Sequence, residues 1–428
     1  MSILKVRLWG RHVASVEMQG DIAVFQYTPD FASSGIELSP LHLPLQRAPY
    51  SFPALPRASF HGLPGLLSDS LPDRFGNALI NAWLATEGRD EASFGPLDRL
   101  AYTGTRAMGA LEYLPAVGPD ASSSDRVDVE AMRRLAGEVL HDRSSLAADL
   151  GDRTVAMRHL LRVGTSAGGA RAKALIAWNE TTNEVRSGQV GAGEGFGCWL
   201  LKFDGVSGNR DKELEDPVGY GALEFAYHRM ATAAGLEMAE CRLLEEAGRR
   251  HFMTRRFDRT DAGRLHMLSL AGMAHYDFNA AGAHSYEQAM GVIRRLGMGM
   301  DALEQQFRRA AFNVVARNQD DHVKNIAFLM DREGTWTLAP AFDVTYSYNP
   351  AGAWTSTHQM RLNNKRDGFE ASEFVALGRT VGLRRGRAKR ILAEVVEVVA
   401  AWQDFADEVG IDRDWAEEVA SNHRLLGT

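Results

Sequence analysis

An acidic cluster near residue 320 carries the residue types that phosphoryl-transfer enzymes use. Asp320 stands five positions before Asn325, and Asp343 follows 18 positions after that asparagine. In such enzymes one carboxylate orients or deprotonates the attacking hydroxyl, while an asparagine and an aspartate hold the magnesium ions on the nucleotide. The residue types and their spacing therefore favour phosphoryl transfer. By itself the Asp-x4-Asn pattern is weak, because Asp-rich loops also form ordinary helix-to-strand connections.

The segment between Asn325 and Asp343 predicts a β-hairpin. Residues 326–330 (IAFLM) form a short apolar run, residues 331–334 (DREG) are typical of a turn, and residues 335–342 (TWTLAPAF) favour a second strand. Pairing of the two strands would bring their outer ends to the same edge. We therefore expect Asn325 and Asp343 to face one another, at the place where a metal ion bridging two phosphates would sit.

Two further segments favour nucleotide binding. Residues 164–173 (GTSAGGARAK) form a Gly-rich turn before a strand, and such backbone can aim its N–H groups at phosphates. Ala170 stands where a P-loop requires lysine, so a simple Gly-rich hairpin fits as well. Lys202 lies in an apolar strand pattern (WLLKF) and needs either solvent or an anionic partner. Glu224, at the start of a predicted helix, is the nearest candidate partner.

Composition indicates a globular protein of two or three domains. The chain has 428 residues, 45% of them apolar, and 48 basic against 55 acidic residues give a net charge of −7. This balance argues against a broad nucleic-acid-binding surface, although it leaves room for a local basic patch. Two cysteines without metal-ligand spacing, no signal-peptide core and no apolar run of about 20 residues predict a reduced, cytoplasmic protein without a membrane span.

The order of the predicted elements favours an α+β, two-lobed, kinase-like fold. Residues 1–115 are β-rich and then contain a helix at 72–86. Residues 116–254, which begin with a Ser-rich linker candidate, form a mixed N-lobe with the Gly-rich loop and the phosphate lysine. Residues 255–428 form a mainly helical C-lobe that carries the catalytic hairpin. We expect the nucleotide to lie in the cleft between the lobes.

Several motifs together resemble a known family. The motifs are SAGGARAK, WLLKF, LEFAYHRMATAAGL, TRRFDR, SYE, FNVVARNQDDHVKN and LAPAFDVT, and LLSDSLPDRFGNALI in the front half is similar to the N-terminal domain of the same family. The resemblance is to the HipA family, serine/threonine protein kinases that act as toxins of type II toxin–antitoxin modules. It covers residues 1 to about 400. It implies that Asp320 is the catalytic aspartate and that Asn325 and Asp343 bind Mg²⁺.

The same resemblance implies a set of ATP-binding residues. Lys202 would contact the phosphates, the backbone of residues 255–257 would meet adenine, and autophosphorylation of Ser166 would eject the Gly-rich loop. The implied set is Ser166, Ala167, Gly168, Gly169, Ala170, Arg171, Lys173, Lys202, Glu224, Arg255, Arg256, Phe257, His322 and Lys324. We expect His322 to brace its loop by hydrogen bonds, and Arg256 to pair with Asp258. Arg255 departs from relatives that have an acidic residue there, and Asp321 has no role assigned by sequence.

The resemblance also implies partners. A helix-turn-helix antitoxin similar to HipB would bind this chain, and operator DNA would be reached only through that antitoxin. The protein substrate would belong to translation, with an aminoacyl-tRNA synthetase as the leading candidate. Two other functions stay open: a small-molecule phosphotransferase, and a catalytically silent corepressor that binds the antitoxin.

Overall fold

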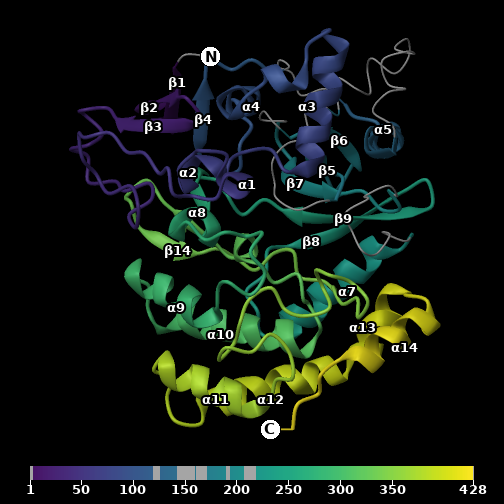
Figure 1. The fold of residues 1–428 in the computed structure, drawn as a ribbon. Helices are drawn as coiled ribbons and strands as arrows, with labels where there is room; N and C mark the ends of the chain where they lie inside the picture. The colour runs from purple at the N-terminus through teal and green to yellow at the C-terminus, as the bar shows by residue number, and fades with distance from the viewer. Residues whose placement is uncertain are drawn as a thin grey trace.

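The chain folds into three parts, which Figure 1 shows as a small β-sheet domain and a five-stranded sheet side by side above a helical lobe. The computed structural model describes residues 3–118, 126–141, 160, 171–188, 193–206 and 218–427. This arrangement confirms the predicted α+β, two-lobed class. Five residues of the predicted nucleotide loop lie outside the described residues, namely Ser166, Ala167, Gly168, Gly169 and Ala170.

The first sheet joins the two ends of residues 4–114. Its antiparallel strands follow the order β3-β2-β1-β4, with bounds β1 (Leu4–Leu8), β2 (Arg11–Gln19), β3 (Ile22–Tyr27) and β4 (Leu111–Leu114). Alternating side chains in β1 bury Leu4, Val6 and Leu8 on one face of the sheet. Five helices lie between β3 and β4 in the chain: α1 (Arg57–Phe60), α2 (Gly65–Ser68), α3 (Arg74–Thr86), η1 (Glu91–Ser93) and α4 (Pro96–Thr103).

The second sheet forms the N-lobe. Its antiparallel order is β6-β5-β7-β9-β8, with bounds β5 (Lys173–Asn179), β6 (Glu184–Ser187), β7 (Gly197–Lys202), β8 (Cys241–Glu246) and β9 (Arg249–Arg255). Two helices, α3 and α5 (Val129–His141), share a hydrophobic core with it through residues such as Phe75, Met132 and Leu201. The helix predicted at 72–86 is thus confirmed as α3, and it packs on the N-lobe sheet.

The C-lobe is helical around a three-stranded sheet. The sheet order is β12-β13-β14, with bounds β12 (His266–Ser269), β13 (Ala327–Met330) and β14 (Trp336–Leu338). The helices are α8 (Leu270–Ala274), α9 (Tyr286–Arg295), α10 (Met300–Val315), η3 (Val323–Asn325), α11 (Ala371–Thr380), α12 (Arg387–Ala400), α13 (Trp402–Val409) and α14 (Arg413–Asn422). A small hairpin of β10 (Arg259–Thr260) and β11 (Gly263–Arg264) precedes β12, and α7 (Tyr220–Ala233) of the N-lobe contacts α13.

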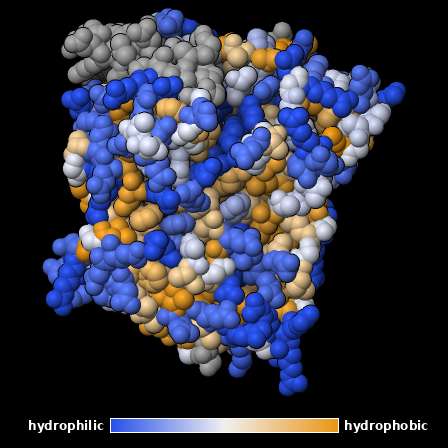
Figure 2. All heavy atoms as spheres, turned by 180° about the vertical axis from the view of Figure 1, so that it is seen from behind, coloured by the Kyte–Doolittle hydropathy of each residue, from blue (hydrophilic) through white to orange (hydrophobic). Residues whose placement is uncertain are grey.

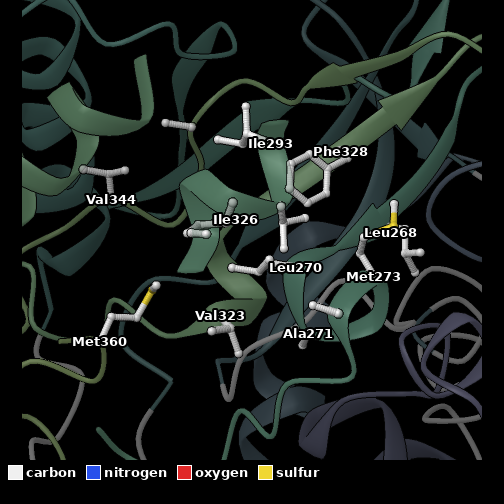
Figure 3. Close-up of a cluster of buried hydrophobic side chains, with 14 of the residues drawn as sticks. Leu268, Leu270, Ala271, Met273, Ile293, Val323, Ile326, Phe328, Val344 and Met360 are labelled. Carbon is white, nitrogen blue, oxygen red and sulfur yellow. The ribbon is translucent and has the colours of Figure 1, made fainter. Parts of the chain in front are cut away.

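A continuous hydrophobic core lies beneath residues 320–326, which contain the predicted catalytic Asp320 and are called the catalytic loop from here on. Figure 3 shows Val323 and Ile326 of that loop among Phe328 of β13, Val344 and Met360. These five side chains are buried. The catalytic loop therefore packs on buried side chains that come from its own hairpin and from the segment after Asp343.

The outer surface is mainly hydrophilic on the face seen in Figure 2, where hydrophobic residues gather in patches. In the part of the chain that the structure describes, no helix has the length and apolar character needed to cross a membrane.

Asp258 ties the start of the C-lobe to the N-terminal domain. Its buried carboxylate accepts hydrogen bonds from Arg256 (Nη2 to Oδ2, 2.7 Å), from Arg259 (Nη1 to Oδ2, 2.7 Å) and from the backbone N–H of Gly109 (2.6 Å). The predicted pairing of Arg256 with Asp258 is confirmed. Burial disfavours the ionised carboxyl, but the guanidinium groups of Arg256 and Arg259 outweigh this and lower the pKa of Asp258 to about 2.

This environment predicts a pH-dependent contribution to stability. Because the folded pKa of Asp258 lies below its ordinary value of 3.8, its contribution is complete above pH 3.8 and is lost as pH falls through about 2. It amounts to about 2 kcal/mol. The free energy of unfolding of the wild type should therefore exceed that of Asp258→Asn by a margin that shrinks between pH 4 and pH 2. Urea titrations at several pH values measure this margin, and a margin independent of pH would contradict the assignment.

Candidate active site

The predicted hairpin is present and brings the two distant acidic segments together. Its strands pair with Phe328 opposite Leu338, and the N–H of Ala339 continues the ladder to the carbonyl of Ala327 (2.9 Å). The turn is stabilised by the Asp331 side chain, which accepts the N–H of Thr335 (2.8 Å). Residues from both outer ends line one small cavity, namely His322, Asn325 and Ile326 on one side and Ala341, Phe342 and Val344 on the other.

Asp320 lies at the surface of the catalytic loop. Its side chain is 33% exposed, and its backbone carbonyl accepts a hydrogen bond from Nδ2 of Asn325 (2.9 Å). This bond closes the loop between the two residues. It also orients the Asn325 amide, because an amide whose nitrogen is engaged presents its oxygen to the opposite side.

Lys202 joins the two lobes. Its Nζ lies 2.5 Å from Oε1 of Glu224 in α7 and 2.5 Å from Oδ1 of Asp343. Burial disfavours the ammonium, but the carboxylates of Asp343 and Glu224 outweigh it and raise the pKa of Lys202 above its ordinary value. The lysine is therefore charged throughout the physiological range. The predicted Lys202–Glu224 pairing is present, and it extends to Asp343.

Arg171 and Lys173 take structural partners. The Nη1 of Arg171 contacts the second carboxylate oxygen of Glu224 (2.8 Å), and its guanidinium lies 4.0 Å from the ring centroid of Tyr220. The Nζ of Lys173 lies 2.9 Å from Oδ2 of Asp73, and the lysine is 2% exposed. We therefore assign Lys173 to the packing of α3 against β5. The family resemblance implies that Lys173 binds ATP. In the structure its ammonium is buried and is paired with Asp73.

The donor chemistry of Asn325 and Asp343 fits magnesium. Mg²⁺ prefers oxygen ligands and is commonly held by one or two protein carboxylates plus phosphate oxygens and water. Asp343 offers a carboxylate that is 28% exposed, and the oriented amide of Asn325 offers its Oδ1. The described residues contain no cluster of three or more His, Cys, Asp or Glu side chains that could hold a metal unaided.

Comparisons with known families agree with the motifs. The HipA-like C-terminal domain matches residues 165–402, and the HipA N-terminal domain matches residues 4–114. The chain belongs to the HipA family. A search of curated protein sequences finds no match.

Solved structures show that the HipA fold is shared by this chain. The HipA of the Shewanella oneidensis MR-1 toxin–antitoxin system, solved with HipB and its operator DNA, gives a TM-score of 0.67 at 16% identity and covers 98% of this chain and 94% of that one. The Helicobacter pylori proinflammatory kinase CtkA gives a TM-score of 0.32 at 11% identity, over 53% of this chain and 88% of that one. The second likeness is too slight to support an argument.

Asp321 lies next to Asp320, and the sequence assigns it no role. In this HipA-family chain its carboxylate is buried and accepts three hydrogen bonds, from Tyr286 Oη (2.6 Å), His358 Nδ1 (2.9 Å) and the backbone N–H of Gln359 (2.7 Å). Burial and the nearby Asp321 charge raise the pKa of Tyr286 well above its ordinary value, so the phenol stays protonated and donates. Asp321 therefore anchors the catalytic loop to α9 and to the segment around residue 358.

His358 carries this anchor onward to the C-terminal tail. Its Nε2 lies 2.8 Å from Nη1 of Arg424. Because arginine has no acceptor, Nε2 must accept and Nδ1 must carry the hydrogen that is donated to Asp321. The backbone N–H of Arg424 bonds to the carbonyl of Val315 at the end of α10 (2.8 Å). The tail, α10 and the catalytic loop are thus joined in one hydrogen-bonded unit.

Residues 255–257, the hinge that the family resemblance implies would meet adenine, differ in whether their side chains and backbone N–H groups already have partners. The Arg256 side chain is occupied by Asp258, and the exposed Arg255 side chain reaches Oε2 of Glu240 (3.1 Å), which balances the cation that sequence comparison left unexplained. The backbone N–H groups of Arg255 and Arg256 donate to Glu240 and Cys198. The ring of Phe257 lies 5.7 Å from the ring of Phe342, beside the apolar residues Ala327, Leu329, Leu265 and Met267.

His322 and Lys324 follow Asp320 closely in the chain. The Nε2 of His322 lies 3.8 Å from Oδ1 of Asp320, and Nζ of Lys324 lies 4.2 Å from the ring centroid of Phe278. The expected bracing of the loop by the His322 ring is not seen, because neither ring nitrogen makes a hydrogen bond within the described residues. The loop is braced instead by the backbone carbonyl of His322, which accepts the N–H of Asn325 (2.9 Å).

Substitution of the two adjacent aspartates should separate chemistry from structure. Asp321→Asn replaces one carboxylate oxygen by an amide NH2, which cannot accept a hydrogen bond from the donor that faces it, so we expect the free energy of unfolding to fall by about 2–3 kcal/mol, and turnover to fall with it. Asp320→Asn changes a partly exposed side chain and should leave the melting temperature nearly unchanged while abolishing turnover. Denaturant titration and phosphoryl-transfer assays on both variants measure this. Equal stability of the two variants would show that Asp321 is not an anchor.

Proposed function

We propose that this HipA-family chain is an ATP- and magnesium-dependent serine/threonine protein kinase, acting as the toxin of a toxin–antitoxin pair on a component of translation. The observation that carries the proposal is the Lys202 ammonium, held between Glu224 and Asp343 beside the closed loop of Asp320 and Asn325. A charged lysine, two oxygen donors and a partly exposed carboxylate are the groups that phosphoryl transfer requires.

Each group has a role that follows from its contacts. Lys202 would leave Asp343 for the nucleotide phosphates while Glu224 holds its position, and Asp343 and Asn325 would then bind magnesium, which neutralises phosphate charge. Asp320 would accept the proton of the acceptor hydroxyl. The hydroxyl oxygen forms a bond to the γ-phosphorus, and the bond from that phosphorus to the bridging oxygen of ADP breaks. The products are a phosphorylated hydroxyl and ADP.

The apolar cluster around Phe257 supplies a place for the base. Phe257, Leu265 and Met267 come from the start of the C-lobe, and Phe342 stands next to the metal-binding Asp343. A flat adenine ring gains from burial against such side chains. The backbone N–H groups of Arg255 and Arg256 already donate to carbonyls of the protein. Adenine would therefore make its polar contacts with backbone carbonyls or with the backbone N–H of Phe257. This supports nucleotide binding between the lobes.

Removal of the catalytic carboxylate tests the proposed reaction. Asp320→Ala should slow phosphoryl transfer by about 100-fold or more, since loss of a general base typically has that effect. Binding of ATP, measured by calorimetry, should persist because Lys202 and Asp343 remain. Asp261→Ala, which changes an exposed aspartate between β10 and β11, is the matched control. A variant that still transfers phosphate at the wild-type rate would exclude Asp320 as the base.

A labelling experiment decides whether the group that accepts the phosphate belongs to a protein or to a small molecule. Incubation of the protein with labelled ATP and cell lysate should label a protein band and leave small molecules unlabelled. Labelled small molecules would favour a small-molecule phosphotransferase, and no ATP binding at all would favour a silent corepressor. Autophosphorylation of Ser166 and the identity of the translation component remain proposals that rest on the family resemblance.

A local basic surface supports a place in an operator complex. Arg384, Arg385, Lys389 and Arg390 are exposed around the start of α12, and no ion pair joins them to an acidic group within the described residues. Arg387, on the same turn, is neutralised by Glu304 (2.7 Å). The described surface of an acidic protein thus contains a cationic patch of the kind that contacts phosphate backbones. The HipA structure from Shewanella was solved with HipB and operator DNA. DNA contact would then be direct as well as through the antitoxin.

Charge reversal tests this patch. Arg384→Glu with Arg385→Glu should weaken operator binding by the assembled complex by about 10-fold or more, and should reduce its dependence on salt. Kinase activity and antitoxin binding should be unchanged. Lys5→Glu with Arg7→Glu, two exposed cations on β1, is the matched control. Fluorescence anisotropy with operator DNA at several salt concentrations measures both effects. An unchanged salt dependence would show that the patch does not face DNA.

A further inference from the structure

Trp354 contacts the side chain that the proposed reaction uses as its base. Its indole Nε1 donates a hydrogen bond to Oδ1 of Asp320 at 2.7 Å, across 34 positions of sequence. The ring of His322 stands farther away, at 3.8 Å from the same oxygen. No donor is bonded to the other carboxylate oxygen, Oδ2, within the described residues. One oxygen of the catalytic carboxylate is therefore held, and the other is left to receive a proton.

The segment that carries Trp354 is fastened to the catalytic loop on both sides of the tryptophan. Before it, the N–H of Ser347 bonds to the carbonyl of Arg317 (3.1 Å). After it, Gln319 Nε2 donates to the carbonyl of Thr355 (2.8 Å), and the N–H of Gln359 donates to Asp321 (2.7 Å). The Gln359 side chain also donates to the carbonyl of Trp354 itself. The backbone on both sides of the indole is thus positioned by hydrogen bonds that do not involve the Asp320 side chain.

This arrangement has a physical consequence for Asp320. A carboxylate that is 33% exposed can rotate about its side-chain bonds, and each rotation would turn Oδ2 away from the acceptor. A charge-assisted hydrogen bond from a ring with only two side-chain torsions restricts this rotation at low entropic cost. Catalysis depends on a reacting group held in one geometry.

We propose that Trp354 is a positioning residue, whose indole N–H holds Oδ1 of Asp320 so that Oδ2 faces the acceptor hydroxyl. The inference rests on the proposed kinase function and extends it to a residue that no motif identifies. Trp354 does not touch ATP or the transferred phosphate in this scheme. Its effect should therefore be on kcat, and the KM for ATP should stay unchanged.

Three substitutions separate the hydrogen bond from the bulk of the ring. Trp354→Phe keeps a flat ring and removes the N–H, and we expect kcat to fall by about 10-fold, the factor that loss of one hydrogen bond to a charged group produces. Trp354→His restores a ring N–H and should recover part of the loss. Trp354→Ala removes both and should be the slowest. Trp9→Phe is the matched control, because the indole of Trp9, in the N-terminal domain, also donates at 2.7 Å, to the carbonyl of Arg264 in β11.

Each outcome decides the inference. A Trp354→Phe enzyme with wild-type kcat would overturn it, because the ring without its N–H would then be sufficient. A Trp354→His enzyme slower than Trp354→Phe at unchanged melting temperature would also overturn it, because ring size and not the N–H would then decide the rate. The indole ¹H–¹⁵N resonance of Trp354 gives a readout that does not require turnover, and it should move in Asp320→Ala. If Asp320→Ala itself transfers phosphate normally, the proposed function fails first, and that result is distinct from a failure of the role of Trp354.

Discussion

The ammonium group of Lys202 is the charge around which the two lobes are arranged. A buried lysine is stable only with anionic partners, and here one partner comes from α7 of the N-lobe and the other from the end of the C-lobe hairpin. The sheet that carries Lys202 and the hairpin that carries Asp343 must therefore stay within contact distance. Arg171 adds a second cation on the far side of Glu224, so the charges alternate in sign from the N-lobe into the site. Nucleotide phosphates would replace Asp343 as the anionic partner of Lys202, so that the charges would still alternate in sign.

Two adjacent aspartates show how burial decides the use of one residue type. Asp320 is partly exposed, and one of its oxygens has a single donor, whereas Asp321 is buried and accepts from Tyr286, His358 and Gln359. A carboxylate with three donors gains its stability from them and has little left to offer a substrate. A carboxylate with one held and one open oxygen can accept a proton. The loop thus has a structural carboxylate, Asp321, directly after the carboxylate that is proposed to accept the proton, Asp320.

The elements that were predictable were those whose signal is local. The 326–342 hairpin was expected from an apolar run, a DREG turn and a second run, and α3 from its helical pattern, and both are present. Pairing of Lys202 with Glu224 followed from the need of a buried cation for an anion. The contacts of Asp321 and Trp354 were not predictable, because their partners lie 34 to 38 positions away. Tyr286 comes from α9, whereas Trp354, His358 and Gln359 lie in a segment without regular structure. The burial of Lys173 depends on α3 crossing to the N-lobe sheet, which no local pattern indicates. Near the C-terminus, α12 and α13 are separated at Ala401, where Trp402 is buried and its indole donates to the carbonyl of Ala416 in α14 (3.0 Å).

The way the segment after Asp343 is ordered bears on how such an enzyme would be controlled. In many kinases the corresponding segment is ordered by a phosphate that pairs with arginine, so that modification switches activity on. Here hydrogen bonds link Asp321 to His358 and His358 to Arg424, and Asp321 also accepts the backbone N–H of Gln359. The segment after Asp343 therefore has these partners once the protein is folded. These partners are supplied by the chain itself, and ordering this segment requires no added charge. Control by modification would then act on the nucleotide side of the site, where the proposed phosphorylation of Ser166 in the Gly-rich loop would remove ATP binding and leave the catalytic loop intact.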